Sequence, residues 1–132
     1  MYRVGLAISL IAIQAYADTD SITGSWSWGA PGEAGGSLKM IQVGEKVRFQ
    51  LELSRGPPSY NNGFIEGQFV LTGNEGIFRT DELGACELHF SFKDHVVTVR
   101  EVADECGFGY GVTATGTYML DSAVTPALQP NE

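Results

Sequence analysis

The side chains that could do chemistry in this sequence are few, and their spacing fits no catalytic motif. His89 falls on the polar side of an alternating segment and His95 falls in a turn, so neither has the neighbouring ligands of a zinc site. The acidic pairs Asp81-Glu82 and Asp104-Glu105 lack the alternating oxygen ligands of a calcium-binding loop. No Gly-x-Ser-x-Gly motif marks a hydrolase nucleophile. We therefore expect a protein that is not an enzyme and that holds neither a metal nor a cofactor.

The two cysteines carry the strongest chemical signal. A lone cysteine pair in an exported chain is expected to form a disulfide, here between Cys86 and Cys106. A turn near Asp94 makes the segment between them a hairpin, with Cys86 opposite about Glu101. The bond should then fold residues 103–106 back over the open end of that hairpin. Closing a loop of about 20 residues stabilises a small domain by about 3 kcal/mol.

A glycine-aromatic segment, Gly107-Phe108-Gly109-Tyr110-Gly111, follows the second cysteine directly. It does not fit a phosphate-binding loop, because it enters a strand and has no lysine. Two interpretations stay open. The loop presents Phe108 and Tyr110 rigidly to a partner, or the two rings close the end of the fold and the glycines only turn the chain.

The first interpretation defines a binding site. Rigid aromatic side chains are frequent centres of binding energy, and neighbouring carboxylates would form an acidic rim. The longest connection between strands, residues 55–63, contains two prolines and one exposed aromatic residue. The predicted contacts are therefore Phe108, Tyr110 and Tyr60, with Asp104 and Glu105 as charge partners.

The elements that must position these residues are predicted to be short strands. Apolar and polar residues alternate with period two over residues 47–53, 65–71 and 86–92, which is typical of half-buried strands. About eight such segments are separated by short turns rich in Gly, Asn and Asp. We expect an all-β fold over residues 18–120, a single small antiparallel barrel of about eight strands in a meander. A two-sheet β-sandwich is the alternative.

The N-terminus has the organisation of a secretory signal peptide. Arg3 precedes the apolar run Val4–Ile13, and Ala15-Tyr16-Ala17 fits the cleavage rule, so residues 1–17 are the predicted signal. An apolar run of about ten residues is too short to span a membrane. The sequence predicts a periplasmic or secreted protein without a membrane anchor. The polar segment 121–132 is expected to be a disordered tail.

The charge of the chain narrows the class of partner. Sixteen acidic residues against eight basic ones leave a net charge of −8. Nucleic acids are excluded, because phosphate binding requires clusters of lysine and arginine. An acidic surface instead suits a partner protein with a basic surface.

Two resemblances add to these expectations. Gly24-Ser25-Trp26 at the start of a meander resembles the calycin (lipocalin-like) architecture, in which the tryptophan packs across the closed end of the barrel. The pattern Cys86-x-Leu88-x-Phe90-x-Phe92, then Cys106-Gly107-Phe108-Gly109 and Gly116-x-Tyr118, resembles uncharacterised exported bacterial proteins. Some of those proteins are joined to lysozyme-inhibitor-type domains. This chain lacks the Ser-Gly and Lys-Gly signatures of the small periplasmic lysozyme-inhibitor barrels.

These observations predict an exported, non-catalytic binding protein. One form of that function is inhibition of a basic hydrolase such as lysozyme by insertion of the glycine-aromatic loop. The alternatives are a calycin-like carrier of a small apolar ligand and a structural protein of the cell envelope.

Overall fold

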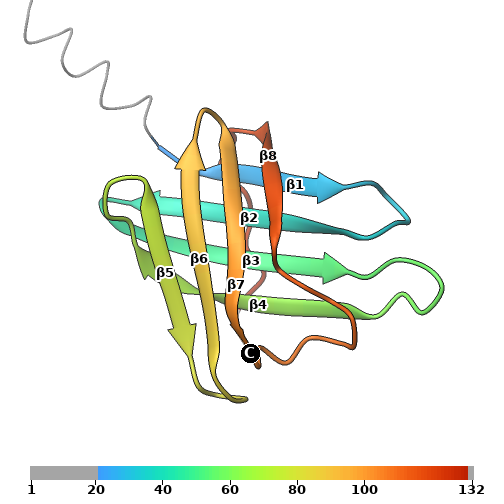
Figure 1. The fold of residues 1–132 in the computed structure, drawn as a ribbon. Coiled ribbons are helices and arrows are strands. Elements are labelled where there is room, and N and C mark those ends of the chain that lie inside the picture. Colours follow the sequence, from blue (N-terminus) through green and yellow to red (C-terminus); the bar gives the residue numbers. More distant parts are fainter. Residues whose placement is uncertain (1–20, 131–132) are drawn as a thin grey trace, which may run out of the picture.

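A computed structural model describes residues 21–130, so the predicted signal peptide lies outside the described residues (Figure 1). This part of the chain contains eight strands and no helix, which confirms the all-β prediction. No helix able to span a membrane occurs between residues 21 and 130. The strands are β1 (Gly24–Gly29), β2 (Gly35–Val43), β3 (Lys46–Ser54), β4 (Asn62–Val70), β5 (Glu75–Thr80), β6 (Cys86–Lys93), β7 (Val96–Asp104) and β8 (Gly116–Ser122).

The strands form one antiparallel sheet in the order β4-β3-β2-β1-β8-β7-β6-β5. In Figure 1, β1–β4 lie behind and β5–β8 cross in front of them at a steep angle. The two halves join where β1 pairs with β8, and the register shifts there between Ser25 and Trp26. Such a bulge increases the local bend of a sheet. The result is a nearly closed barrel, as the alternating segments predict.

The connections divide into short and long ones by position. Three short turns, residues 44–45, 71–74 and 94–95, join β2 to β3, β4 to β5 and β6 to β7. Asp94 and His95 both have positive φ (52° and 65°), as a two-residue hairpin turn requires. Successive connections of a meander alternate between its ends. The four longer connections therefore gather at the opposite end, toward the lower right of Figure 1. We call the end with the three short turns the turn end. The end with the four longer connections is the loop end (residues 30–34, 55–61, 81–85 and 105–115).

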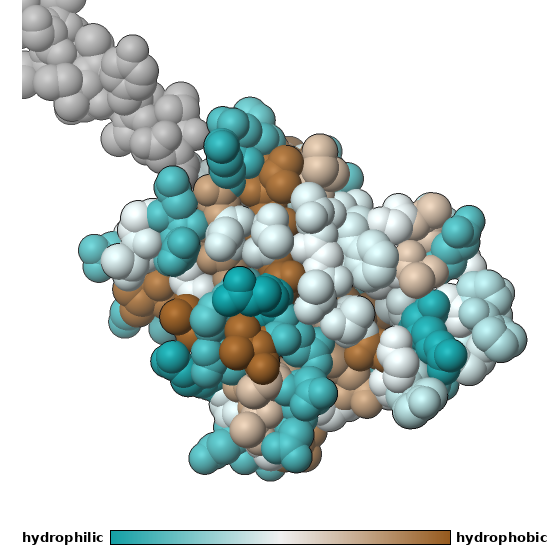
Figure 2. Space-filling view, in the orientation of Figure 1, coloured by the Kyte–Doolittle hydropathy of each residue, from teal (hydrophilic) through white to brown (hydrophobic). Residues whose placement is uncertain are grey.

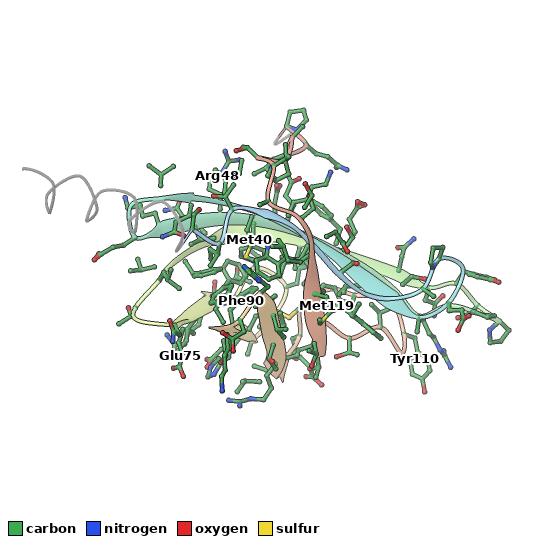
Figure 3. All side chains as sticks on the ribbon, turned by 90° about the horizontal axis from the view of Figure 1, so that it is seen from above. Met40, Arg48, Glu75, Phe90, Tyr110 and Met119 are labelled. Carbon is green, nitrogen blue, oxygen red and sulfur yellow. A yellow bond between two sulfur atoms is a disulfide. The ribbon has the colours of Figure 1, made fainter. Side chains whose placement is uncertain are left out.

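Aromatic rings fill the space between the two halves of the barrel. The ring of Phe49 lies 5.1 Å from that of Phe78 and 5.2 Å from that of Phe90, measured between centroids. Phe69 and Phe90 stack at 4.6 Å. Viewed from above, Met40 and Phe90 lie between the halves, whereas Arg48 points outward (Figure 3). Side chains thus occupy the interior that a carrier would leave open for its ligand.

The barrel is open between β4 and β5, which form no ladder beyond a bridge from Thr72 to Glu75 in their turn. Rings cover this seam from within. The Phe78 ring lies against Gly67 of β4, and the Phe69 ring lies against Gly76 of β5, each where a Cβ atom would collide with it. Each strand thus lacks a side chain where the other strand supplies a ring.

The predicted register of the cysteine hairpin is wrong. Cys86 pairs with Asp104, and Glu101 pairs with Leu88. The turn is centred between Asp94 and His95, which moves the partner of Cys86 from about residue 101 to residue 103, and a bulge between Glu87 and Leu88 moves it one further, to Asp104. Cys106 then lies only two positions beyond the ladder. The Cα atoms of the two cysteines are 4.9 Å apart. The disulfide extends the hairpin and does not require residues 103–106 to fold back over its end.

The C-terminal segment lies along the outer face of β2 and β3. Strand β8 continues to Ser122, into the region expected to be a tail. The Gln50 side chain, only 4% exposed, accepts a hydrogen bond from the Gln129 main-chain N–H and donates one to its carbonyl, both at 2.8 Å. The Lys39 ammonium donates to the Ala127 carbonyl at 3.4 Å. These bonds hold the described part of the expected tail against the sheet.

Candidate functional site

Phe108 closes the barrel at the loop end. Its side chain is half-buried and packs on the core. It lies directly over Gly63 of β4, where a Cβ atom would be 2.6 Å from the Phe108 Cδ1 atom. The second interpretation of the loop is thus the one that fits the position of Phe108.

Tyr110 has the opposite surroundings. Its side chain is 83% exposed and projects from the far end of the molecule in Figure 3. The main chain beneath it is fixed, because the Asn61 side-chain amide donates to the Tyr110 carbonyl at 2.8 Å and the Gly109 N–H donates to the Asn62 carbonyl at 2.9 Å. The Arg55 guanidinium lies 5.5 Å from the ring centroid, within the range of a cation–π contact.

Tyr60 comes from the connection on which Tyr110 is docked. It is 56% exposed, as predicted. Its N–H donates to the Gly56 carbonyl at 2.8 Å, and the Arg55 N–H donates to the Asn61 carbonyl at 2.8 Å, so the connection is internally bonded. We call this group the tyrosine surface, made of Arg55, Tyr60, Asn61 and Tyr110.

The loop that carries Tyr110 is held at both ends. The disulfide fixes its start, and both sulfur-bearing residues are buried. At its other end, the Glu101 carboxylate accepts hydrogen bonds from the Ala114 N–H (2.8 Å) and the Thr113 hydroxyl (3.2 Å). The Glu101 N–H also donates to the Thr115 hydroxyl at 3.0 Å. Eleven residues of loop are thereby attached to the rigid hairpin β6–β7.

The two predicted charge partners differ in surroundings. Glu105 is bonded to the β5–β6 connection, since its carboxylate accepts the Ala85 N–H at 2.8 Å and its own N–H donates to the Ala85 carbonyl at 2.9 Å. Asp104 ends β7 and is exposed. Exposed Asp81 and Glu82 belong to that β5–β6 connection. The acidic rim therefore surrounds the disulfide, whereas the tyrosine surface lies on the β3–β4 side of the loop end.

Sequence reasoning did not find Arg55, Asn61 or Glu101. Their roles depend on which loops meet, and nothing in local spacing shows that residue 61 lies beside residue 110. The aromatic residues carried a local signal, because exposed rings in connections rich in glycine or proline are unusual.

A charged cluster on the outer face of β5–β7 also escaped prediction. The Glu87 carboxylate accepts from the Arg79 Nε at 2.8 Å and pairs with the His89 Nε2 at 2.6 Å. These hydrogen bonds, that of His89 first, lower the pKa of Glu87 below its ordinary value. The Arg100 Nη2 lies 3.2 Å from the His89 Nδ1, which must then be the acceptor. The contacts recorded for His89 join it to charged groups and to no hydroxyl nucleophile.

Residues 21–130 contain no group of three or more His, Cys, Asp or Glu side chains placed to hold a metal ion. Comparison of the chain with protein families, curated proteins and solved structures found no match in any of the three. The two resemblances noted in the sequence therefore stay predictions.

Proposed function

We propose that this protein is an exported, non-catalytic binding protein that contacts a basic partner protein through its loop end. The observation that carries the proposal is the tyrosine surface. The main chain beneath two exposed rings, Tyr60 and Tyr110, is held by hydrogen bonds, and the guanidinium of Arg55 lies over the Tyr110 ring. Exposed tyrosines on a fixed main chain are typical of the centres of binding interfaces.

Preorganisation explains how two tyrosines could dominate an interface. Tyrosine offers a large contact area with only two side-chain torsions to fix, so it loses little entropy on binding. Since the loop main chain is already bonded, less conformational entropy is lost when a partner docks. Exposed Leu83 of the β5–β6 connection would collide with a side chain at Gly107, so it lies beside the loop and extends the apolar contact area.

Charge supports a basic partner. The chain carries −8, and the loop end holds exposed Asp81, Glu82 and Asp104 around the disulfide. These carboxylates would attract a positively charged surface and raise the rate of encounter. A disulfide-bonded small β fold is compatible with the periplasm or the extracellular space. A basic hydrolase such as lysozyme, inhibited by Tyr110 inserted into its cleft, is the form of the function that we propose to test first.

The test is a calorimetric titration of the protein into a lysozyme of the chicken type, at low and at high salt. Tyr110→Ala should weaken binding about tenfold or more, as expected for a central aromatic contact. Asp104→Lys should weaken binding at low salt and matter less at high salt, because salt screens exposed charges. Arg48→Gln on the outer face of β3 is the control and should leave the affinity unchanged.

Binding that is saturable and inhibits hydrolysis, but survives Tyr110→Ala, would show that the tyrosine surface is not the contact. An absence of binding to lysozyme would remove that hydrolase as the partner.

A further inference from the structure

A hollow of about 670 Å³ lies at the turn end, opposite the tyrosine surface. Its floor is apolar, and its rim is made of residues from the short turns. A volume in this range is typical of small-molecule sites. The floor residues are Ile22, Trp26, Leu71 and Phe92, and rim residues include Gln42, Asn74, Lys93, Asp94 and His95.

The polar atoms near the floor already have partners within the protein. The Trp26 indole N–H donates to the Ile22 carbonyl at 3.3 Å. The Gln42 side chain accepts from the Ile22 N–H at 3.0 Å and donates to the Gly44 carbonyl at 2.9 Å. With these groups satisfied, the floor offers a ligand mainly ring faces, ring edges and aliphatic carbon. Trp26 and Phe92 meet there edge to face, with centroids 6.5 Å apart.

The rim carries a positive charge, the ammonium of Lys93, that forms no ion pair within the described residues. Among residues 21–130 an ion pair joins Glu87 to Arg79, Glu87 also accepts a hydrogen bond from His89, and Lys93 takes part in neither contact. Asp94 is adjacent in sequence and forms no ion pair with Lys93 in this part of the chain. The ammonium of Lys93 can therefore bind an anionic group of a ligand, whereas the carboxylate of Asp94 would repel that group.

We propose that the turn-end hollow binds a small amphipathic molecule, with a flat apolar body on Trp26 and Phe92 and an anionic head beside Lys93. The site goes beyond the proposed protein contact, because it lies at the other end of the barrel and uses no residue of the tyrosine surface. It also differs from an internal carrier site, since aromatic rings fill the barrel interior.

Two fluorescent probes with related apolar bodies test this site. Anilinonaphthalene sulfonate carries an anionic group, and N-phenyl-1-naphthylamine carries none. Protein produced from the full sequence should bind each probe saturably. Lys93→Gln should weaken binding of the anionic probe about threefold, as loss of one exposed charge interaction predicts, and leave the neutral probe within about twofold. Arg48→Gln removes one cation from the outer face of β3 and should leave both affinities unchanged.

Two further variants separate charge from shape. Asp94→Asn keeps a residue that tolerates the positive φ of this position and should strengthen binding of the anionic probe. Asn74→Trp should fill the hollow and weaken both probes, whereas Val124→Trp adds an exposed ring elsewhere and should not. Thermal unfolding of each variant confirms that it is folded.

The proposal is overturned if neither probe binds saturably, or if Asn74→Trp and Val124→Trp have equal effects. Equal weakening of the anionic probe by Lys93→Gln and Arg48→Gln would also overturn it, because the effect would then reflect net charge alone. None of these results depends on whether the tyrosine surface binds a protein.

Discussion

At the scale of single residues, Phe108 and Tyr110 occupy one loop but face different surroundings. Truncating a half-buried ring removes packing on the core, whereas truncating an exposed ring removes almost none. Phe108→Ala should therefore lower the free energy of unfolding by about 2 kcal/mol. Tyr110→Ala should lower it by less than about 1 kcal/mol, which is the size of an exposed cation–π contact with Arg55.

Urea unfolding of the two variants beside the unaltered protein measures this difference. Equal losses of stability would mean that Tyr110 is a structural residue, and its use as a binding contact would lose its main support.

Glu87 provides a second prediction at this scale, concerning pH. Its hydrogen bonds with His89 and Arg79 lower its pKa from the ordinary value of 4.5 in the folded state. The ionised carboxylate therefore stabilises the fold above that ordinary value, and this contribution is lost as the pH falls through the lower, folded-state pKa. The unaltered protein should lose stability on acidification more steeply than Glu87→Gln.

Melting temperatures between pH 6 and pH 2 give the comparison, with Glu52→Gln as the matched charge control on the outer face of β3. If Glu87→Gln followed the same acid dependence as the unaltered protein, the hydrogen bonds of Glu87 would not be acting on its ionisation.

At the scale of elements, the seam between β4 and β5 depends on the absence of a side chain. A Cβ atom at Gly67 would collide with the Phe78 ring, which is itself packed at 5.1 Å from Phe49. Gly67→Ala should therefore destabilise the protein by about 1–3 kcal/mol through overpacking. Gln68→Ala changes the exposed neighbouring position on the same strand and should cost much less.

Chemical unfolding of Gly67→Ala, alone and combined with Phe78→Leu, tests this account. The smaller leucine should recover part of the loss caused by the new methyl group. If the two substitutions were simply additive, Phe78 would not be the side chain that Gly67 accommodates.

The hairpin β6–β7 and its disulfide give another prediction for an element. The bond joins residues 20 positions apart, so its removal in Cys86→Ala/Cys106→Ala should lower the free energy of unfolding by about 3 kcal/mol. The effect should also be local, because the loop that carries Tyr110 begins at Cys106. Removal of the disulfide should therefore speed hydrogen exchange of the Gly109 amide, which is bonded to the Asn62 carbonyl, more than that of amides in the centre of β3.

Hydrogen exchange with and without the disulfide measures this change. Unaltered protection at Gly109 would indicate that Glu101 and Asn61 hold the loop without help from the cysteines.

Sequence reasoning was most successful for the elements. Period-two alternation identified the strands, because a half-buried strand must place apolar side chains on one face. It could not reveal that the turn is centred between Asp94 and His95, nor the bulge between Glu87 and Leu88, which breaks the alternation by a single residue. The predicted register was wrong for these two reasons. Gly67 likewise looked like an ordinary member of an apolar face, because the ring it accommodates belongs to another strand.

At the scale of the whole molecule, chain connectivity creates the candidate site. A meander places alternate connections at opposite ends, so four loops spread between residues 30 and 115 come together. The position of the four loops at one end follows from the topology, but which loops contact one another does not follow from it. Docking of Tyr110 beside Asn61 depends on the curvature of the barrel, which local patterns do not encode.

The central claim is that the tyrosine surface at the loop end is the binding surface of this protein. The most direct measurement immobilises the unaltered protein, the Tyr60→Ala/Tyr110→Ala variant and the Arg48→Gln control, and compares what each retains from extracellular or envelope extract. We expect the unaltered protein and Arg48→Gln to retain the same basic protein, released at high salt, and the double tyrosine variant to lose it. Equal retention by all three, or retention of no basic protein by any, would contradict the account.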